Sequence, residues 1–263
     1  MRQLRAIEEK ISMNKIFDIF KNKKAFIPFI TCGDPSLSLT AEAVKVMEKA
    51  GADIIELGVP FSDPTAEGPD IQAADERALK AGTTPDKIFD MIENIREEVS
   101  VPLILVTYGN VVFSYGIDRF ADRAAKTGVA GIVVQDVPCE EKEEFEEVFR
   151  KYGIAMIMSV AHTSKERIKM IAENAEGFIN CVLTADTKDA FGDIRYMVSE
   201  IKKVKDIPCV VAHDFLTVDS VKEIAELADG VIASADIVKI CAGYEEKSIP
   251  RIAEYVKMIK EVL

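Results

Sequence analysis

Short apolar runs alternate along this chain with segments in which apolar residues recur every three or four positions. The runs are continuous, which is typical of strands that are buried on both faces of a parallel sheet. The recurring pattern between them is that of amphipathic helices. The expected strands are Ala25–Thr31, Asp53–Leu57, Leu103–Thr107, Gly131–Gln135, Ala155–Ser159, Phe178–Leu183, Cys209–Ala212 and Gly230–Ala233.

The intervals between these runs predict helices that bury one apolar face. The N-terminal segment also has apolar residues at helical spacing, from Leu4 through Ile7 and Ile11 to Ile16 and Phe20, and it predicts an amphipathic helix or a broken pair. The helices expected elsewhere include Ala41–Lys49, Asp86–Glu98, Ile117–Lys126, Glu140–Tyr152, Ser164–Asn174, Ile194–Lys203, Val218–Glu226 and Ile249–Val262.

Eight strands that alternate with helices, without a polar linker between them, favour an α/β fold of the (β/α)₈ barrel class. We expect residues 1–263 to form one barrel domain with an extra N-terminal helix, because such a barrel takes about 250 residues. An open doubly wound sheet is the alternative. In a barrel, the chemistry lies at the C-terminal ends of the strands and in the loops that follow them.

Composition narrows the class of ligand. The formal net charge of −12 argues against nucleic acid or an anionic membrane surface, since both require a basic patch. Five cysteines without a CxxC pair favour a reducing compartment. No apolar run approaches the ~20 residues of a membrane span, and Met1–Lys24 lacks the apolar core of a signal peptide. We therefore expect a cytoplasmic protein that binds small molecules or protein partners.

Two carboxylates follow the second expected strand. Glu56 interrupts an apolar run and shares the period-two face of Ile54, so it is expected to point into the barrel near its mouth. A general acid or base fits this position, because burial raises a carboxyl pKa towards neutrality. The alternative is that Glu56 pairs with a lysine or caps a neighbouring loop. Glu67 lies in a proline-rich loop, where a solvated carboxylate is the ordinary outcome.

Several segments of the chain resemble the signature segments of the tryptophan synthase alpha subunit family. The likeness extends over essentially the whole predicted barrel. The matching segments are Phe29-Ile30-Thr31-Cys32-Gly33-Asp34-Pro35, Glu56-Leu57-Gly58-Val59-Pro60-Phe61-Ser62-Asp63-Pro64, Gly68-Pro69, Ile71-Gln72, Thr107-Tyr108-Gly109-Asn110 and Gln135-Asp136-Val137-Pro138.

This resemblance implies the barrel fold and the retro-aldol cleavage of indole-3-glycerol phosphate to indole and glyceraldehyde 3-phosphate. It implies no cofactor in this chain and a pyridoxal-phosphate beta subunit as partner. Glu56 matches the family's catalytic glutamate. Glu67 matches a second catalytic carboxylate that is normally an aspartate, so here the side chain is one methylene longer.

The resemblance also implies binding roles for other residues. Phe29 and Tyr108 match positions that line the family's indole pocket, although barrel core explains both equally well. Pro60 and Asp63 lie on the loop that resembles the family's contact with the beta subunit.

The chain departs from the family at three turns that seat the substrate phosphate. Asp186, Asp214 and Asp236 follow the last three strands, where the family has glycine-rich turns. Asn180 replaces a tyrosine near the end of the sixth strand. Ser234 stands one position from the family's serine, and His213 beside Asp214 offers polar groups at a strand end. Ser234, His213 and Asp214 are therefore the candidates for binding the substrate at this side of the barrel mouth.

Three functions remain open at this point. The chain is an active alpha-type lyase, or a diverged barrel that binds and activates a beta subunit without cleaving the substrate. The third possibility is an enzyme for a non-phosphorylated or cationic ligand. A histidine with nearby aspartates can bind a divalent metal, but a hydrogen-bonded loop histidine is the simpler interpretation, and we expect no metal site.

Overall fold

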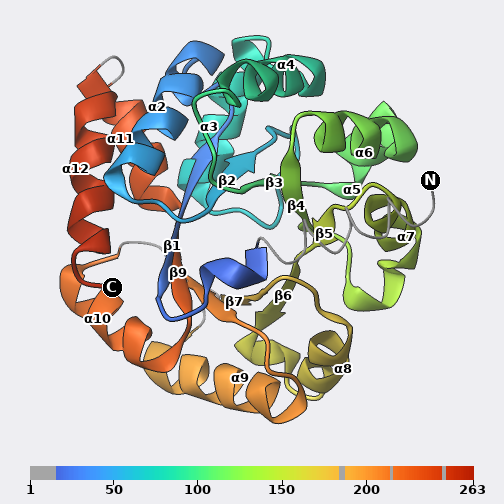
Figure 1. Cartoon of the computed structure of the whole chain (residues 1–263), viewed down its shortest axis with the longest axis vertical. Helices are drawn as coiled ribbons and strands as arrows, with labels where there is room; N and C mark the ends of the chain where they lie inside the picture. The colour runs from blue at the N-terminus through green and yellow to red at the C-terminus, as the bar shows by residue number, and fades with distance from the viewer. Residues whose placement is uncertain (1–15, 184–186, 214–215, 245–246) are drawn as a thin grey trace.

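Parallel strands form a barrel at the centre of the molecule, and helices form a ring around it (Figure 1). The computed structural model describes residues 16–183, 187–213, 216–244 and 247–263. Its strands are β1 (Ala25–Thr31), β2 (Ile55–Gly58), β3 (Leu103–Thr107), β4 (Val129–Val134), β5 (Ala155–Met156), β6 (Met158–Ala161), β7 (Ile179–Val182), β8 (Cys209–Ala212) and β9 (Gly230–Ala233).

The two ends of the sheet are strands that are adjacent in the sequence, and this closes the barrel. The strand order is β5-β4-β3-β2-β1-β9-β8-β7-β6, so β5 and β6 stand at the two ends of the sheet. Only Ile157 separates them, and its amide donates to the Ile132 carbonyl at 2.8 Å. β5 and β6 are thus two halves of the fifth predicted strand. The eight-stranded barrel is confirmed, and the alternative of an open doubly wound sheet is wrong.

The helices predicted between and after the strands are all present; Ile117–Lys126 has the predicted bounds and the others have changed ends. In the described chain they are α2 (Leu37–Ala50), α3 (Pro69–Lys80), α4 (Pro85–Ile95), α5 (Gly109–Tyr115), α6 (Ile117–Lys126), α7 (Glu143–Lys151), α8 (Arg167–Asn174), α9 (Ala190–Val204), α10 (Val218–Leu227), α11 (Ala235–Tyr244) and α12 (Ser248–Lys260), with 3₁₀ turns at Cys139–Glu141 and His162–Ser164. None of these described helices combines the length and apolar character needed to cross a bilayer.

Three of these helices, α3, α5 and α11, were not singled out from the sequence. α5 has only seven residues, which is too short for a clear helical period. Local capping determines the ends of others. The Ser36 hydroxyl accepts from the Leu39 amide, so α2 begins several residues before the predicted Ala41.

The core has two layers because neighbouring strand residues point to opposite faces. Alternate positions such as Ile27 and Phe29 join one buried cluster inside the barrel, together with Ile54 and Phe178. The intervening positions, such as Phe26, face the helices in a second cluster. Since Glu56 follows Ile54 by two positions, its side chain lies on the inward face, as the sequence predicted.

A helical turn at residues 16–19 closes one end of the barrel (Figure 1). Ile16 is fully buried in the inner cluster, and the Phe20 ring lies 5.8 Å from that of Phe178. This agrees with the predicted N-terminal helix for the part that is described, whereas Leu4, Ile7 and Ile11 lie outside the described residues. The apolar plug fills the N-terminal end of the barrel and leaves its chemistry at the opposite mouth.

Asp53 joins both ends of the described chain to the start of the barrel. Its carboxylate, 6 % exposed, accepts from the Phe26 amide at 2.8 Å and pairs with Lys23 and with Lys260 of α12 at 2.5 Å each. The buried carboxylate is thereby compensated by one amide and two cations, so these contacts hold α12 against β1.

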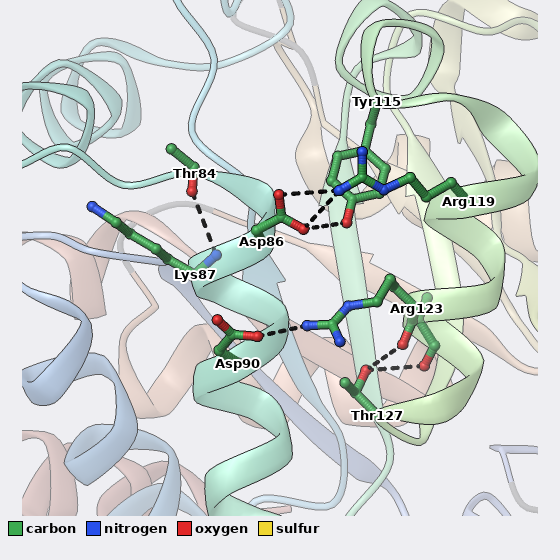
Figure 2. A network of polar contacts seen from close by, with 9 residues as sticks. Thr84, Asp86, Lys87, Asp90, Tyr115, Arg119, Arg123 and Thr127 are labelled. Atoms are coloured by element: carbon green, nitrogen blue, oxygen red, sulfur yellow. Dashed lines mark hydrogen bonds and ion pairs between the residues drawn. The ribbon is translucent and has the colours of Figure 1, made fainter.

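Outside the barrel, polar contacts connect α4 to the chain that follows β3 (Figure 2). Asp86 accepts from the Tyr115 hydroxyl at 2.5 Å and lies within 3.3 Å of Arg119, and Asp90 pairs with Arg123 at 2.6 Å. Most of these groups are exposed, so each pair contributes little stability alone. Together they fix the orientation of Tyr115.

We expect Asp53→Ala to lower the free energy of unfolding by about 3 kcal/mol, because removing one partner of a buried charge cluster leaves the others uncompensated. Urea unfolding followed by circular dichroism measures the change. Asp206→Ala is the control, since Asp206 is 99 % exposed and only loosely paired with Lys202 at 3.5 Å. Equal stability of both variants would show that the cluster around Asp53 does not hold the barrel together.

Candidate active site

Glu56 lies on β2 with its side chain directed into the barrel. It is 4 % exposed, and within the described residues its Oε1 atom has no hydrogen-bond partner. Its neighbours in the sheet are Phe29 on β1 and Ile104 on β3. The expected alternative of a lysine partner is wrong, because no ion pair of Glu56 is formed in the described chain. A buried, unpaired carboxyl of this kind is costly unless it is protonated.

Burial, with a smaller contribution from the negative charge of Glu67, raises the pKa of Glu56 from its ordinary value of 4.5 to about 8. The carboxyl therefore carries a proton at neutral pH. It can give that proton to a bound molecule and take one back close to physiological pH, which is the requirement for general acid and base catalysis.

Glu67 lies in the loop between β2 and α3, at the same mouth of the barrel. Its Oε1 atom accepts from Gln135 Nε2 at 3.0 Å, and its carbonyl accepts from Gln72 Nε2 at 2.8 Å. The charge of Glu67 acts on both Glu56 and Tyr108, so the structure brings the two predicted carboxylates together. Gln135 was part of a signature segment, but no role was assigned to it from the sequence. Its position as a polar residue directly after an apolar strand could have indicated one.

Tyr108 contacts this loop through both its hydroxyl and its ring. It is 3 % exposed, its hydroxyl accepts from the Ala66 amide at 3.1 Å, and its ring lies 5.0 Å from that of Phe61. Burial, followed by the charge of Glu67, raises the Tyr108 pKa, so the hydroxyl stays protonated. Tyr108 therefore touches the chain one residue before Glu67.

Phe29 forms part of the inner wall beside Glu56. It is 4 % exposed and belongs to the inner cluster. A Cβ at Gly58 would lie 2.6 Å from the Phe29 ring, so glycine at this position leaves room for the aromatic side chain. The ring packs in the inner core on the same face of the sheet as Glu56, and its role in lining the indole pocket stays a prediction.

Three further buried side-chain oxygens have no partner in the described chain: Thr31 Oγ1, Thr107 Oγ1 and Asn180 Oδ1. Thr31 follows Phe29 by two positions and Asn180 follows Phe178 by two, so both share the inward face of their strands. In the strand order, β7 stands opposite β2 in the closed barrel, so Asn180 faces Glu56 across it. Buried polar atoms normally bind protein, water or ligand. Thr31 was not identified as a candidate from the sequence.

The predicted phosphate side of the mouth is described only in part. Asp186 and Asp214 lie outside the described residues. His213 follows β8 and Ser234 follows β9, and both are half-buried and engaged in polar contacts. Asp236 differs from expectation: its Oδ2 atom accepts from the Leu216 amide at 3.0 Å and from the Tyr255 hydroxyl at 2.8 Å, so it serves as an internal link. No metal-binding group of His, Cys, Asp and Glu occurs among the described residues.

Pro60 and Asp63 lie at the start of the loop after β2. Asp63 is exposed, and its carboxylate accepts from the Ser62 hydroxyl at 2.6 Å. Pro60 lines a cavity of about 370 Å³ on the outer side of the loop, away from Glu56. The other lining residues are Val59, Phe61, Leu79, Thr83, Thr84, Pro85, Asn110, Val111, Ser114 and Tyr115.

Comparison with known proteins gives a consistent result. The family model described as tryptophan synthase alpha chain matches residues 18–262. The tryptophan synthase alpha chain of Lacticaseibacillus casei is 40 % identical over 252 residues, which cover 94 % of this chain and 95 % of that one. The crystal structure of tryptophan synthase subunit alpha from Legionella pneumophila is 32 % identical with a TM-score of 0.88, covering 95 % and 97 % of the two chains. A structure of Mycobacterium tuberculosis tryptophan synthase is 28 % identical with a TM-score of 0.86, covering 95 % and 97 %.

We expect Glu56→Gln to be more stable than the unaltered chain, and increasingly so as pH rises. Between 4.5 and about 8 the folded chain keeps a proton that the unfolded chain has lost. The stability of the unaltered chain therefore falls through this window, by about 1.4 kcal/mol per pH unit, whereas glutamine has no proton to lose. Urea unfolding at about pH 5 and about pH 8 measures the difference. Parallel pH dependences would contradict a raised pKa at Glu56.

Proposed function

The chain belongs to the tryptophan synthase alpha chain family, and on that premise we propose that it cleaves indole-3-glycerol phosphate to indole and glyceraldehyde 3-phosphate in tryptophan biosynthesis. The observation that carries the proposal is Glu56, an inward-facing carboxyl without a partner whose pKa is raised to about 8.

Glu56 performs both proton transfers of the retro-aldol reaction. Cleavage requires a proton on C3 of the indole ring and removal of the proton from the hydroxyl of the adjacent carbon. A carboxyl that is protonated at neutral pH supplies the first proton, and the carboxylate that results accepts the second. The absence of an ion pair leaves Glu56 available for both steps.

Glu67 binds the indole N–H and stabilises the positive charge that develops on the ring. Gln135 Nε2 holds one oxygen of its carboxylate, and Tyr108 and Gln72 hold the backbone on either side. The extra methylene relative to aspartate adds about 1.5 Å of reach. A shift of the loop backbone accommodates the longer side chain of Glu67, so turnover depends on the position of this loop.

Apolar and polar groups at the barrel mouth bind different parts of the substrate. Phe29 and Tyr108 line the indole pocket near Glu56. The unpartnered Asn180 oxygen accepts from a hydroxyl of the glycerol chain. Ser234 and the amides at the start of α11 bind the phosphate, since a helix N-terminus favours an anion, and His213 is a further substrate-binding residue on this side of the mouth. The contacts of Asp236 with Leu216 and Tyr255 reduce its repulsion of the phosphate.

The partner is a tryptophan synthase beta subunit, which carries the pyridoxal phosphate; this chain needs no cofactor of its own. Pro60 and Asp63 form the docking surface together with the cavity beside them. The docking residues and Glu67 occupy one loop, so the partner contacts the segment that carries a catalytic group. We place the protein in the cytoplasm and assign residues 1–263 to a single barrel domain.

We expect Glu56→Gln to abolish release of glyceraldehyde 3-phosphate from indole-3-glycerol phosphate, because the amide transfers no proton. A coupled dehydrogenase assay on the purified chain, with and without a beta subunit, measures turnover. Glu98→Gln is the matched control, because Glu98 is exposed and pairs with Lys45 far from the site. Normal turnover of Glu56→Gln would remove Glu56 from the mechanism. Failure of the unaltered chain to bind the substrate would indicate a barrel that only docks on a beta subunit or takes another ligand.

We expect Asp63→Ala to weaken binding of the beta subunit about tenfold while the fold is kept, because it removes an exposed charge from the docking surface. Isothermal titration calorimetry with a beta subunit measures the affinity. Asp206→Ala provides the comparison, since it removes the same charge just before β8, at the other end of the barrel. Equal affinities of the two variants would place the partner elsewhere.

A further inference from the structure

Asp75 is a buried carboxylate to which the mechanism above assigns no role. It lies on α3 among Ile71, Ala74 and Ala78, the apolar face of the helix, and is only 5 % exposed. The next residue, Glu76, points to solvent and pairs with Lys80. A carboxylate on the buried face of a helix is costly, so its contacts are informative.

The hydrogen bond of Asp75 reaches the loop that carries Glu67. The Phe61 amide donates to Asp75 Oδ2 at 3.4 Å. The charged and titratable groups that face Asp75 are Glu67 from this loop, Asp34 and Cys32 from the turn after β1, and Tyr108 after β3. Arg77 does not compensate Asp75, because its guanidinium is engaged by both oxygens of Asp34 at 2.7 Å each. In the described chain Asp75 forms no ion pair.

This environment places the titration of Asp75 near neutrality. Burial is the main cause that raises the pKa of Asp75 from 3.8 to about 7; this net value also includes an opposing effect of the hydrogen bond from Phe61 and smaller rises from the charges of Glu67 and Asp34. The carboxyl of Asp75 therefore changes its charge in the pH range in which the enzyme works. The amide of Phe61 binds an ionised carboxylate more strongly than a protonated one.

The loop after β2 is attached at few points. At its start the Val59 amide donates to the Val106 carbonyl at 2.9 Å, and at its end Tyr108 and Gln135 hold the chain around Glu67. The contact between Phe61 and Asp75 lies between these attachments. α3 contacts the loop here and again at Gln72, whose Nε2 donates to the Glu67 carbonyl at 2.8 Å, so the bond between Phe61 and Asp75 fixes the first half of the loop relative to α3.

We propose that Asp75 is a positioning residue for the cleavage reaction: it anchors the β2–α3 loop through the Phe61 amide, and its negative charge strengthens that anchor. The inference rests on the proposed function, because it assigns Asp75 an effect on the position of Glu67 and not a contact with the substrate.

Two substitutions distinguish the effect of the hydrogen bond from Phe61 from the effect of the negative charge of Asp75. Asp75→Asn keeps an oxygen that accepts from Phe61 and removes the charge, whereas Asp75→Ala removes both. Glu76→Gln is the matched control, because it removes one negative charge from the adjacent, exposed position of the same helix. Circular dichroism establishes that each variant folds before kinetics are compared.

We expect Asp75→Asn to retain kcat within about twofold and to lose from its pH profile the change in kcat that accompanies ionisation of Asp75 near pH 7 in the unaltered chain, because an amide at this position accepts from Phe61 but cannot ionise. Asp75→Ala is expected to lower kcat by about tenfold or more, since loss of the anchor misplaces Glu67. The Glu76→Gln profile is expected to match that of the unaltered chain. Superimposed profiles of Asp75→Asn and Glu76→Gln would refute the charge effect, and equal kcat of Asp75→Ala and Asp75→Asn would refute the anchor.

A second measurement does not depend on turnover. In ¹H–¹⁵N spectra of the full chain, the Phe61 amide is expected to titrate near pH 7 in the unaltered protein and in Glu76→Gln, but not in Asp75→Asn. A pH-independent Phe61 amide in the unaltered chain would overturn the role of Asp75 even if the lyase is active. An inactive chain whose Phe61 amide still titrates would instead refute the proposed reaction and leave the coupling of Asp75 to the loop in place.

Discussion

Closure of the parallel sheet is the constraint on which the other features of this molecule depend. Each strand is hydrogen-bonded on both sides, and the split fifth strand supplies the last pairing through β5 and β6. A closed barrel of this size has an interior only wide enough for side chains. Ile16 and the inner apolar cluster fill its N-terminal end. The polar inward positions, Glu56, Thr31 and Asn180, consequently gather at the other end, where the protein alone leaves their buried oxygens without partners.

The electrostatics of the mouth follow from the same burial. Glu56, Glu67 and Asp75 would place three negative charges beside a pocket that must accept a phosphate ester. Because the pKa values of Glu56 and Asp75 are raised to about 8 and about 7, these two groups are largely or partly protonated near neutral pH. The net charge of the site near neutral pH is therefore less negative than three ionised carboxylates would give. Protonation that suits Glu56 for catalysis also reduces the repulsion of an anionic substrate.

Sequence reasoning predicted the strands because continuous apolar runs between helical segments are unambiguous over a whole barrel. It also placed Glu56 correctly, since a charged residue in an apolar strand is conspicuous at period two. It did not find α5, whose seven residues give no period, nor Asp75, whose burial depends on which face of α3 meets the barrel. Asp236 was interpreted as a charge facing the phosphate, but its partners Leu216 and Tyr255 are distant in sequence and no local pattern indicates them.

The pairing of β1 has a consequence for how the chain is made. β1 joins β2 nearby in sequence, but its other edge pairs with β9, and Asp53 meets Lys260 across 207 residues. During synthesis on the ribosome, the edge of β1 that faces β9 has no strand to pair with until β9 has emerged. An unpaired edge is open to association with other chains. The barrel can thus close only after its last strand is made, and β1 is the strand that waits longest for its second partner.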